Sequence, residues 1–252
     1  MGVNMQVYIS NTVPICVTEF PKTISFVIFF AGCNFRCAYC YNHEILDYKA
    51  KFIIDTKQIK ADIEKNKDII EAVVFSGGEP CLQGSQLAEL AKYAKSLNLK
   101  VCIETNGSKP EIIENMLKQN LVDYIAIDIK TPMEKEIFER VTNSGTFFVN
   151  SEEVMKNIMK TLEILKNYGN KVEIEVRTTI IPSLIYRKED LAGIAELIKN
   201  LNCTWILQGF RADYGAAEKK LANLNAPSKN FLEILKDFII KEYPNMKISI
   251  RI

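Results

Sequence analysis

The stretch "ISFVIFFAGCNFRCAYCYN", residues 24–42, joins an apolar run to three closely spaced cysteines. Its first part, residues 24–31, is rich in β-branched and aromatic side chains, a composition that favours a buried strand. Cys33, Cys37 and Cys40 follow at once, in the loop that would leave this strand. The sequence thus predicts a strand that leads directly into a loop crowded with thiols.

The pattern of an apolar run, a polar loop and a helix-period segment recurs along the whole chain. Strands are expected at residues 24–31, 71–76, 100–104, 122–129, 172–180 and 204–210, and helices near 55–66, 85–97, 110–119, 151–168 and 188–200. Because parallel strands need a crossover connection, this alternation predicts βαβ units. We expect one domain over residues 1–252, in which an extension (1–21) precedes the core (about 22–211) and a helix and strand follow (212–252).

Alternate residues of these strands differ sharply in polarity. One face is predicted to be aliphatic, while the other is rich in charged and polar side chains. The residues of this second face are Lys100, Cys102, Glu104, Tyr124, Ala126, Asp128, Lys130, Glu173, Glu175, Arg177, Thr179, Thr204, Ile206, Gln208 and Phe210. A sheet covered by helices on both sides would be apolar on both faces, and a closed, filled barrel would be aliphatic inside. We therefore expect an α/β fold with a partial, open (β/α)6 barrel, parallel strands, helices outside and a polar ligand in the lumen. Irregular or edge strands would explain the same charges.

Composition sets the broad class of protein. The chain has 252 residues, 48% of them hydrophobic, and a formal net charge of +1. A charge so close to zero gives no reason to expect nucleic acid or a membrane surface as partner. The longest apolar run is too short to cross a bilayer, and the first residues do not resemble a secretory signal. We expect a cytoplasmic protein, in which reduced cysteines serve metal binding or redox chemistry rather than disulfides.

Three thiols in eight positions allow three chemical interpretations. Cys37 and Cys40 could form a redox dithiol, which would leave Cys33 unused. A zinc site could combine the three thiolates with His43, the single histidine of the chain. An iron–sulfur cluster held by three cysteines would leave one iron open to a further ligand.

Two motifs resemble those of the radical S-adenosylmethionine (SAM) enzymes. Cys33-x3-Cys37-x2-Cys40, with Tyr39 before the last cysteine, is similar to their signature loop, and "FSGGEPCLQ" (75–83) resembles their glycine–glycine–glutamate motif. The resemblance implies a 4Fe–4S cluster whose fourth iron takes the amino and carboxylate groups of SAM. It also implies that Gly77, Gly78 and Glu79 bind the SAM amino group, and that Tyr39 stacks beside the adenine.

Residues 8–211 are similar over most of their length to the anaerobic ribonucleoside-triphosphate reductase activating proteins, a group of glycyl-radical-enzyme activases. This resemblance implies reductive cleavage of SAM to a 5′-deoxyadenosyl radical, which takes a hydrogen atom from a glycine of a partner such as anaerobic ribonucleotide reductase. Flavodoxin or ferredoxin would donate the electron. Positions that match the lining of the SAM or substrate cavity are Asn106, Asp128, Lys130, Arg177 and Gln208.

Other interpretations of these residues remain open. "IETNG" (103–107) and "GGEP" (77–80) also resemble 7-carboxy-7-deazaguanine synthase, a radical SAM enzyme that acts on a small anionic pterin. Asn106-Gly107 could be an ordinary turn, and Asp128 and Lys130 could form a salt bridge within one strand. A zinc module without enzymatic activity is the alternative outside enzyme chemistry.

Overall fold

The computed structural model describes residues 5–145 and 150–252, so the first four residues of the expected N-terminal extension lie outside it. All strands belong to one sheet with the order β3-β1-β2-β4-β5-β6-β7-β8-β9. The strands are β1 Gln6–Cys16, β2 Ser25–Phe30, β3 Ile53–Asp55, β4 Ala72–Gly77, β5 Lys100–Thr105, β6 Tyr124–Asp128, β7 Glu173–Ile180, β8 Thr204–Gly209 and β9 Lys247–Arg251.

From β2 to β9, every neighbouring pair of strands is parallel, and the spatial order follows the chain order. The sheet ends at β3 and β9 and does not close on itself. Each crossover therefore moves one place along the sheet, and the prediction of an open, partial barrel with parallel strands is confirmed.

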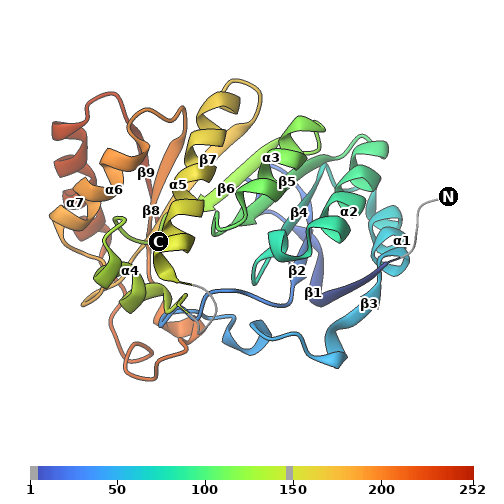
Figure 1. The fold of residues 1–252 in the computed structure, drawn as a ribbon, viewed down its shortest axis with the longest axis horizontal. Coiled ribbons are helices and arrows are strands. Elements are labelled where there is room, and N and C mark those ends of the chain that lie inside the picture. The colour runs from blue at the N-terminus through green and yellow to red at the C-terminus, as the bar shows by residue number, and fades with distance from the viewer. Residues whose placement is uncertain (1–4, 146–149) are drawn as a thin grey trace.

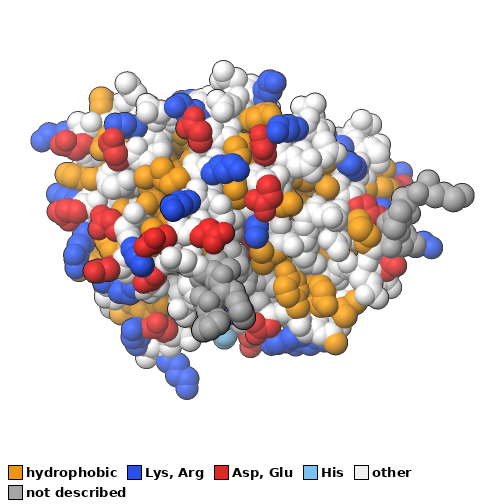
Figure 2. Space-filling model, in the orientation of Figure 1, with side chains coloured by type: hydrophobic (Ala, Val, Ile, Leu, Met, Phe, Trp, Pro, Cys, Tyr) orange, Lys and Arg blue, Asp and Glu red, His pale blue; other side chains and the backbone are white. Residues whose placement is uncertain are grey.

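Helices follow the sheet from α1 at one end to α7 at the other (Figure 1). They are α1 Thr56–Asn66, α2 Gly84–Ser96, α3 Pro110–Lys118, α4 Lys135–Thr142, α5 Ser151–Tyr168, α6 Lys188–Ile198 and α7 Lys229–Glu242. Several begin at side chains that cap free backbone N–H groups. Asp55 accepts a hydrogen bond from Lys57 at the start of α1, and Asn150 and Ser228 do the same for α5 and α7. Basic and acidic side chains are interspersed over the face shown in Figure 2, as the small net charge predicts.

Three of these elements were not predicted from the sequence: strand β1, the short strand β3 and helix α4. Most of the expected extension is β1, which pairs antiparallel with both β2 and β3. Its register shifts between Ile9 and Asn11 and again between Val13 and Cys16, so its side chains do not keep a simple two-residue period. Helix α4 has only 8 residues, too few for a clear helical pattern in the sequence.

The lumen of the barrel is blocked at the amino-terminal end of its strands. Phe20, from the turn between β1 and β2, packs on Tyr124 with ring centroids 4.8 Å apart. Together with Phe20 and Tyr124, small apolar side chains from four strands form a second hydrophobic core: Val27, Ala72, Val74, Cys102 and Ala126. The face predicted as a polar lumen is therefore apolar at its lower end, and a ligand is confined to the opposite end, where the loops are.

This core should make Phe20 important for stability. Phe20→Ala would leave a cavity over Tyr124, so we expect the free energy of unfolding to fall by about 3 kcal/mol in urea titrations. Val17→Ala is the matched control, because Val17 lies in the same turn and is 67% exposed. Equal stability of the two variants would contradict the role given to Phe20.

Candidate active site

The cysteine loop, residues 33–40, leaves β2 and is fastened to two other segments. The Gly32 N–H donates to the Ile45 carbonyl at 2.7 Å, and the Arg36 N–H donates to the Thr142 carbonyl at the end of α4 at 2.9 Å. Helix α4, which was missed in the sequence, thus serves as a brace for the loop.

The three cysteines open into one cavity at the carboxyl ends of the strands. The space among its lining residues is about 830 Å³, part of which is open to solvent. The lining comprises Cys33, Phe35, Cys37, Tyr39, Cys40, Tyr41, Asn42, Leu46, Ser76, Gly77, Gly78, Glu104, Thr105, Asn106, Asp128, Lys130, Arg177, Thr179 and Gln208. Of the predicted site residues, all except Glu79 line this cavity.

Cys37 is buried, Cys33 and Cys40 are half-buried, and the three thiols are not arranged to hold a single ion. Burial raises the pKa of Cys33 and of Cys37 to about 12 and also raises the pKa of Cys40, so a bound cation is needed to favour the thiolates. Among the described residues, no three His, Cys, Asp or Glu side chains are close enough to hold one metal ion. His43 is exposed and does not line the cavity. In the described part of the chain, the three thiols and His43 therefore do not form the zinc site considered in the sequence.

Gly77 and Gly78 let two loops touch. The Gly78 N–H donates to the Phe30 carbonyl at 2.8 Å, and a Cβ added to Gly78 would lie 2.2 Å from the Gly32 carbonyl oxygen. Gly77 has a φ of +112°, which L side chains rarely adopt. The two glycines are therefore required by the chain's own backbone, which packs against the entry to the cysteine loop.

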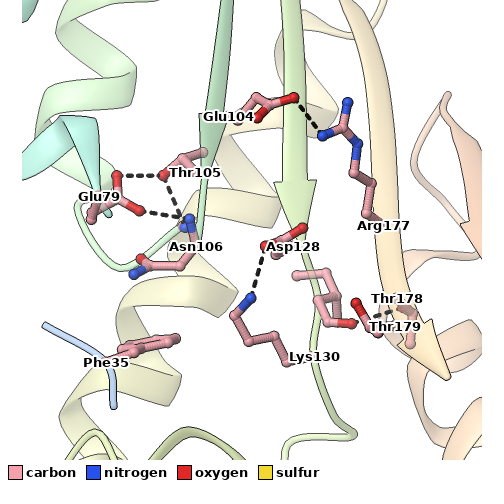
Figure 3. Close-up of polar contacts among 12 residues, drawn as sticks. Phe35, Glu79, Glu104, Thr105, Asn106, Asp128, Lys130, Arg177, Thr178 and Thr179 are labelled. Atoms are coloured by element: carbon pink, nitrogen blue, oxygen red, sulfur yellow. Dashed lines mark hydrogen bonds and ion pairs between the residues drawn. The ribbon is translucent and has the colours of Figure 1, made fainter. Parts of the chain in front are cut away.

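Glu79 lies behind the cavity wall rather than in it. The side chain is fully buried, and its carboxylate accepts from the Cys81 N–H at 3.0 Å. It also accepts from the Thr105 hydroxyl at 2.9 Å and the Asn106 N–H at 2.7 Å (Figure 3). Burial raises the pKa of Glu79, while these donors oppose the shift. In this structure Glu79 ties the glycine loop to the loop after β5, and both of its oxygens have protein partners.

Asp128 and Lys130 point into the cavity from the end of β6. Lys130 Nζ donates to Asp128 Oδ2 at 2.7 Å and lies 5.6 Å from the centre of the Tyr39 ring. Burial alone would lower the pKa of Lys130, but Asp128 and the nearby thiol and phenol groups outweigh it and raise the pKa. The salt bridge considered in the sequence is present, and both partners line the cavity (Figure 3).

Arg177 is the centre of a buried ionic network between the cavity and the apolar lower core. Its guanidinium donates to Glu104 Oε1 and to Glu175 Oε1, both at 2.5 Å. Glu175 also accepts from the Tyr124 hydroxyl at 2.7 Å and from Arg251 of the edge strand β9 at 3.1 Å. Burial would raise the pKa of Glu175, but Arg177 outweighs it and holds the pKa below its ordinary value.

Several cavity residues had no assigned role in the sequence. Strand alternation predicted that Glu104 and Thr179 face the lumen, and both line the cavity. The Thr179 hydroxyl accepts a hydrogen bond from Gln208 Nε2 at 3.3 Å. Tyr41 and Asn42 directly follow the third cysteine, so their place in the cavity could have been inferred from the cysteine spacing alone.

A family model described as the radical SAM superfamily matches residues 27–198, a span that includes the cysteine loop, the glycine loop and strands β4 to β7. The chain belongs to the radical SAM superfamily. The match explains why thiols, glycines and strand-end polar groups meet in one cavity, and it identifies the chain as an enzyme that uses SAM and an iron–sulfur cluster.

Relatives of this radical SAM enzyme include several activating enzymes. A Methanocaldococcus jannaschii protein, provisionally assigned as a glycyl-radical enzyme activating enzyme, is 34% identical over 97% of this chain and 96% of its own length. The pyruvate formate-lyase-activating enzyme of Clostridium pasteurianum is 27% identical over 69% of each chain. The 7-carboxy-7-deazaguanine synthase of Clostridium acetobutylicum is 32% identical over 70% of this chain and 80% of its own.

The fold is also found among solved structures. A radical SAM methyltransferase from Sphaerobacter thermophilus has a TM-score of 0.70 with 12% identity, over 95% of this chain and 68% of that one. At this sequence identity, the structural similarity shows only that the two proteins share a fold.

Gly78→Ala should disrupt the contact between the glycine loop and the cysteine loop. Because the new Cβ meets the Gly32 carbonyl oxygen, we expect anaerobically reconstituted protein to bind much less iron than the unchanged chain. Gly145→Ala is the control, since an added Cβ there meets no atom of the described residues within 4 Å. Full iron content in Gly78→Ala would contradict the close packing of these loops.

Arg177→Met should destabilise the protein in a pH-dependent way. Breaking a buried ion pair costs about 3 kcal/mol, which urea unfolding at slightly alkaline pH would measure. With Arg177 present, the lowered pKa of Glu175 gives stability that is lost as the pH falls through that pKa. Without Arg177, burial would raise the pKa of Glu175, so protonation would relieve the penalty.

The difference in unfolding free energy between Arg177→Met and the unchanged chain should therefore shrink at mildly acidic pH. Arg211→Met, which removes an exposed pair with Asp213, should change little at either pH. A deficit in Arg177→Met that grows with acidity would contradict this assignment.

Proposed function

We propose that this enzyme binds a 4Fe–4S cluster through Cys33, Cys37 and Cys40, cleaves SAM reductively and removes a hydrogen atom from a glycine of a partner enzyme. The partner is a glycyl-radical enzyme, and we propose anaerobic ribonucleotide reductase. The observation that carries the proposal is the opening of all three thiols into one cavity beside the glycine loop and Lys130. When bound, the cluster and SAM would supply the 5′-deoxyadenosyl radical that attacks the substrate.

The lining residues have distinct proposed roles. Tyr39 would form the wall of the SAM site next to the third cysteine, where the Lys130 ammonium group lies over its ring. The backbone of Gly77 and Gly78 would face the SAM amino group, and Glu79, through Asn106, would keep that backbone in place. Asp128, Lys130, Arg177 and Gln208 would form the opposite wall and bind SAM or substrate.

Charge pairing favours an uncharged substrate group. Lys130 and Arg177 are the cations among the described lining residues, and each already pairs with carboxylates. An anionic pterin would need an unpaired cation, whereas a glycine in a polypeptide presents only neutral amide groups. Hydroxyl and amide groups of Thr179, Gln208 and Asn42 suit such a main chain. This supports the activase over the deazaguanine-synthase alternative.

The partner proposal is tested by mixing the components. We expect a glycyl-radical signal in electron paramagnetic resonance spectra when the reconstituted protein is incubated with the reductase, SAM and a low-potential donor such as reduced flavodoxin or ferredoxin. A reductase with its radical glycine changed to alanine should give none. Cleavage of SAM without a radical on the reductase would reject this partner, and turnover of the pterin instead would favour the synthase.

Cys37→Ala tests whether the three cysteines are the ligands of the proposed cluster. Because three thiolates hold the proposed cluster, we expect loss of both the iron and the cleavage of SAM. Cys203→Ala, which changes a cysteine outside the cavity, should retain both. SAM cleavage by Cys37→Ala would overturn the assignment of the ligands.

A further inference from the structure

A ring of hydrogen bonds, two between side chains and one from a backbone N–H, joins the cysteine loop to the loop after β5. Asn34 lies between the first two cysteines, and its Nδ2 donates to the Ser108 hydroxyl at 2.8 Å. Its Oδ1 accepts from Asn106 Nδ2 at 3.0 Å, and the Ser108 N–H donates to Asn106 Oδ1 at 3.0 Å. Asn34, Asn106 and Ser108 thereby provide hydrogen-bond partners for one another across two loops that are far apart in the sequence.

The ring is continuous with the rest of the site. The Asn106 N–H donates to Glu79 Oε2 at 2.7 Å, so hydrogen bonds run from the cysteine loop through the β5 loop to the glycine loop. Asn106 Nδ2 is also 4.0 Å from Cys33 Sγ. Asn106 and Ser108 are buried, where a lost partner costs more than it would in water.

Asn34 occupies the part of the loop that needs such a tie. Backbone hydrogen bonds fasten Cys33 to Leu46 at 3.0 Å and Arg36 to Thr142 at 2.9 Å, on either side of Asn34. The Asn34 side chain adds a third attachment, toward the cavity and the β5 loop. Without it, the backbone hydrogen bonds to Leu46 and Thr142 would remain, but the hydrogen bonds between Asn34 and the β5 loop would be lost.

We propose that Asn34 is a positioning residue, which holds the cysteine loop against the Asn106–Ser108 turn and so fixes the position of the Cys33 sulfur. The inference rests on the proposed cluster site, because its effect is on how firmly that site holds iron. Asn34 touches neither the thiols nor, in this account, the substrate, and it acts through Asn106 and the loop backbone.

The test compares three variants with the unchanged holoenzyme. For Asn34→Ala we expect iron loss to a chelator to become about tenfold faster, which corresponds to about 1.4 kcal/mol and lies within the range measured for the loss of a hydrogen bond. Ser108→Ala should show a smaller acceleration, because the bond from Asn106 to Asn34 remains. Asn34→Ala combined with Ser108→Ala should lose iron no faster than Asn34→Ala alone, if Ser108 acts through Asn34.

Asn34→Asp provides the conservative rescue. A carboxylate can accept from both Asn106 and the Ser108 hydroxyl, so iron retention should stay near that of the unchanged protein. The added negative charge near the thiols should make the midpoint potential of the cluster more negative. Asn167→Ala is the matched control, because it removes one exposed asparagine hydrogen bond on α5.

The outcomes separate this inference from the proposed function. If the unchanged protein holds no iron, the cluster proposal itself fails. If it holds iron and Asn34→Ala retains it equally well, only the role of Asn34 is overturned. Urea unfolding of the iron-free proteins measures any general loss of stability. If Asn34→Ala loses iron faster only because its apoprotein is less stable, and Asn34→Asp does not restore iron retention, the role of Asn34 is also overturned.

Discussion

The site depends on the close approach of two backbones, those of Gly78 and of the chain that enters the cysteine loop. A Cβ on Gly78 would overlap the Gly32 carbonyl oxygen, and the Glu79 N–H donates to that same oxygen at 2.9 Å. Once these segments touch, the Glu79 carboxylate is directed inward to the loop after β5. Three consecutive strand ends are thus joined before any ligand binds, which is how a preorganised site is built.

Below this junction, the lumen changes character in layers. Strand register places Val74, Cys102 and Tyr124 on one level, with Glu104, Ala126 and Glu175 on the next level toward the loops. The level farther from the loops packs against Phe20. In the level nearer the loops, Arg177 forms ion pairs with Glu104 and Glu175 and so neutralises their charges. An open barrel with exposed interior charges would admit water from below. Apolar packing and ion pairing together limit the ligand space to the loop end.

Much of this arrangement could be predicted from the sequence, for identifiable reasons. Thiols at fixed spacing and glycines after a strand are local patterns, and parallel strands bring their carboxyl ends to one edge. The irregular strand β1 could not be predicted, because its bulges break the two-residue period. The orientation of the Glu79 side chain, away from the cavity, could not be predicted either, because its partners Thr105 and Asn106 are more than twenty-five residues away in the chain.

The most direct measurement is the electron paramagnetic resonance spectrum of anaerobically reconstituted, dithionite-reduced protein, recorded with and without SAM. Three thiols that hold a 4Fe–4S cluster with one open iron predict a reduced-cluster signal that shifts when SAM is added. A colourless protein that contains zinc, gives no iron signal and does not respond to SAM would contradict the account and leave the cysteines with a structural role.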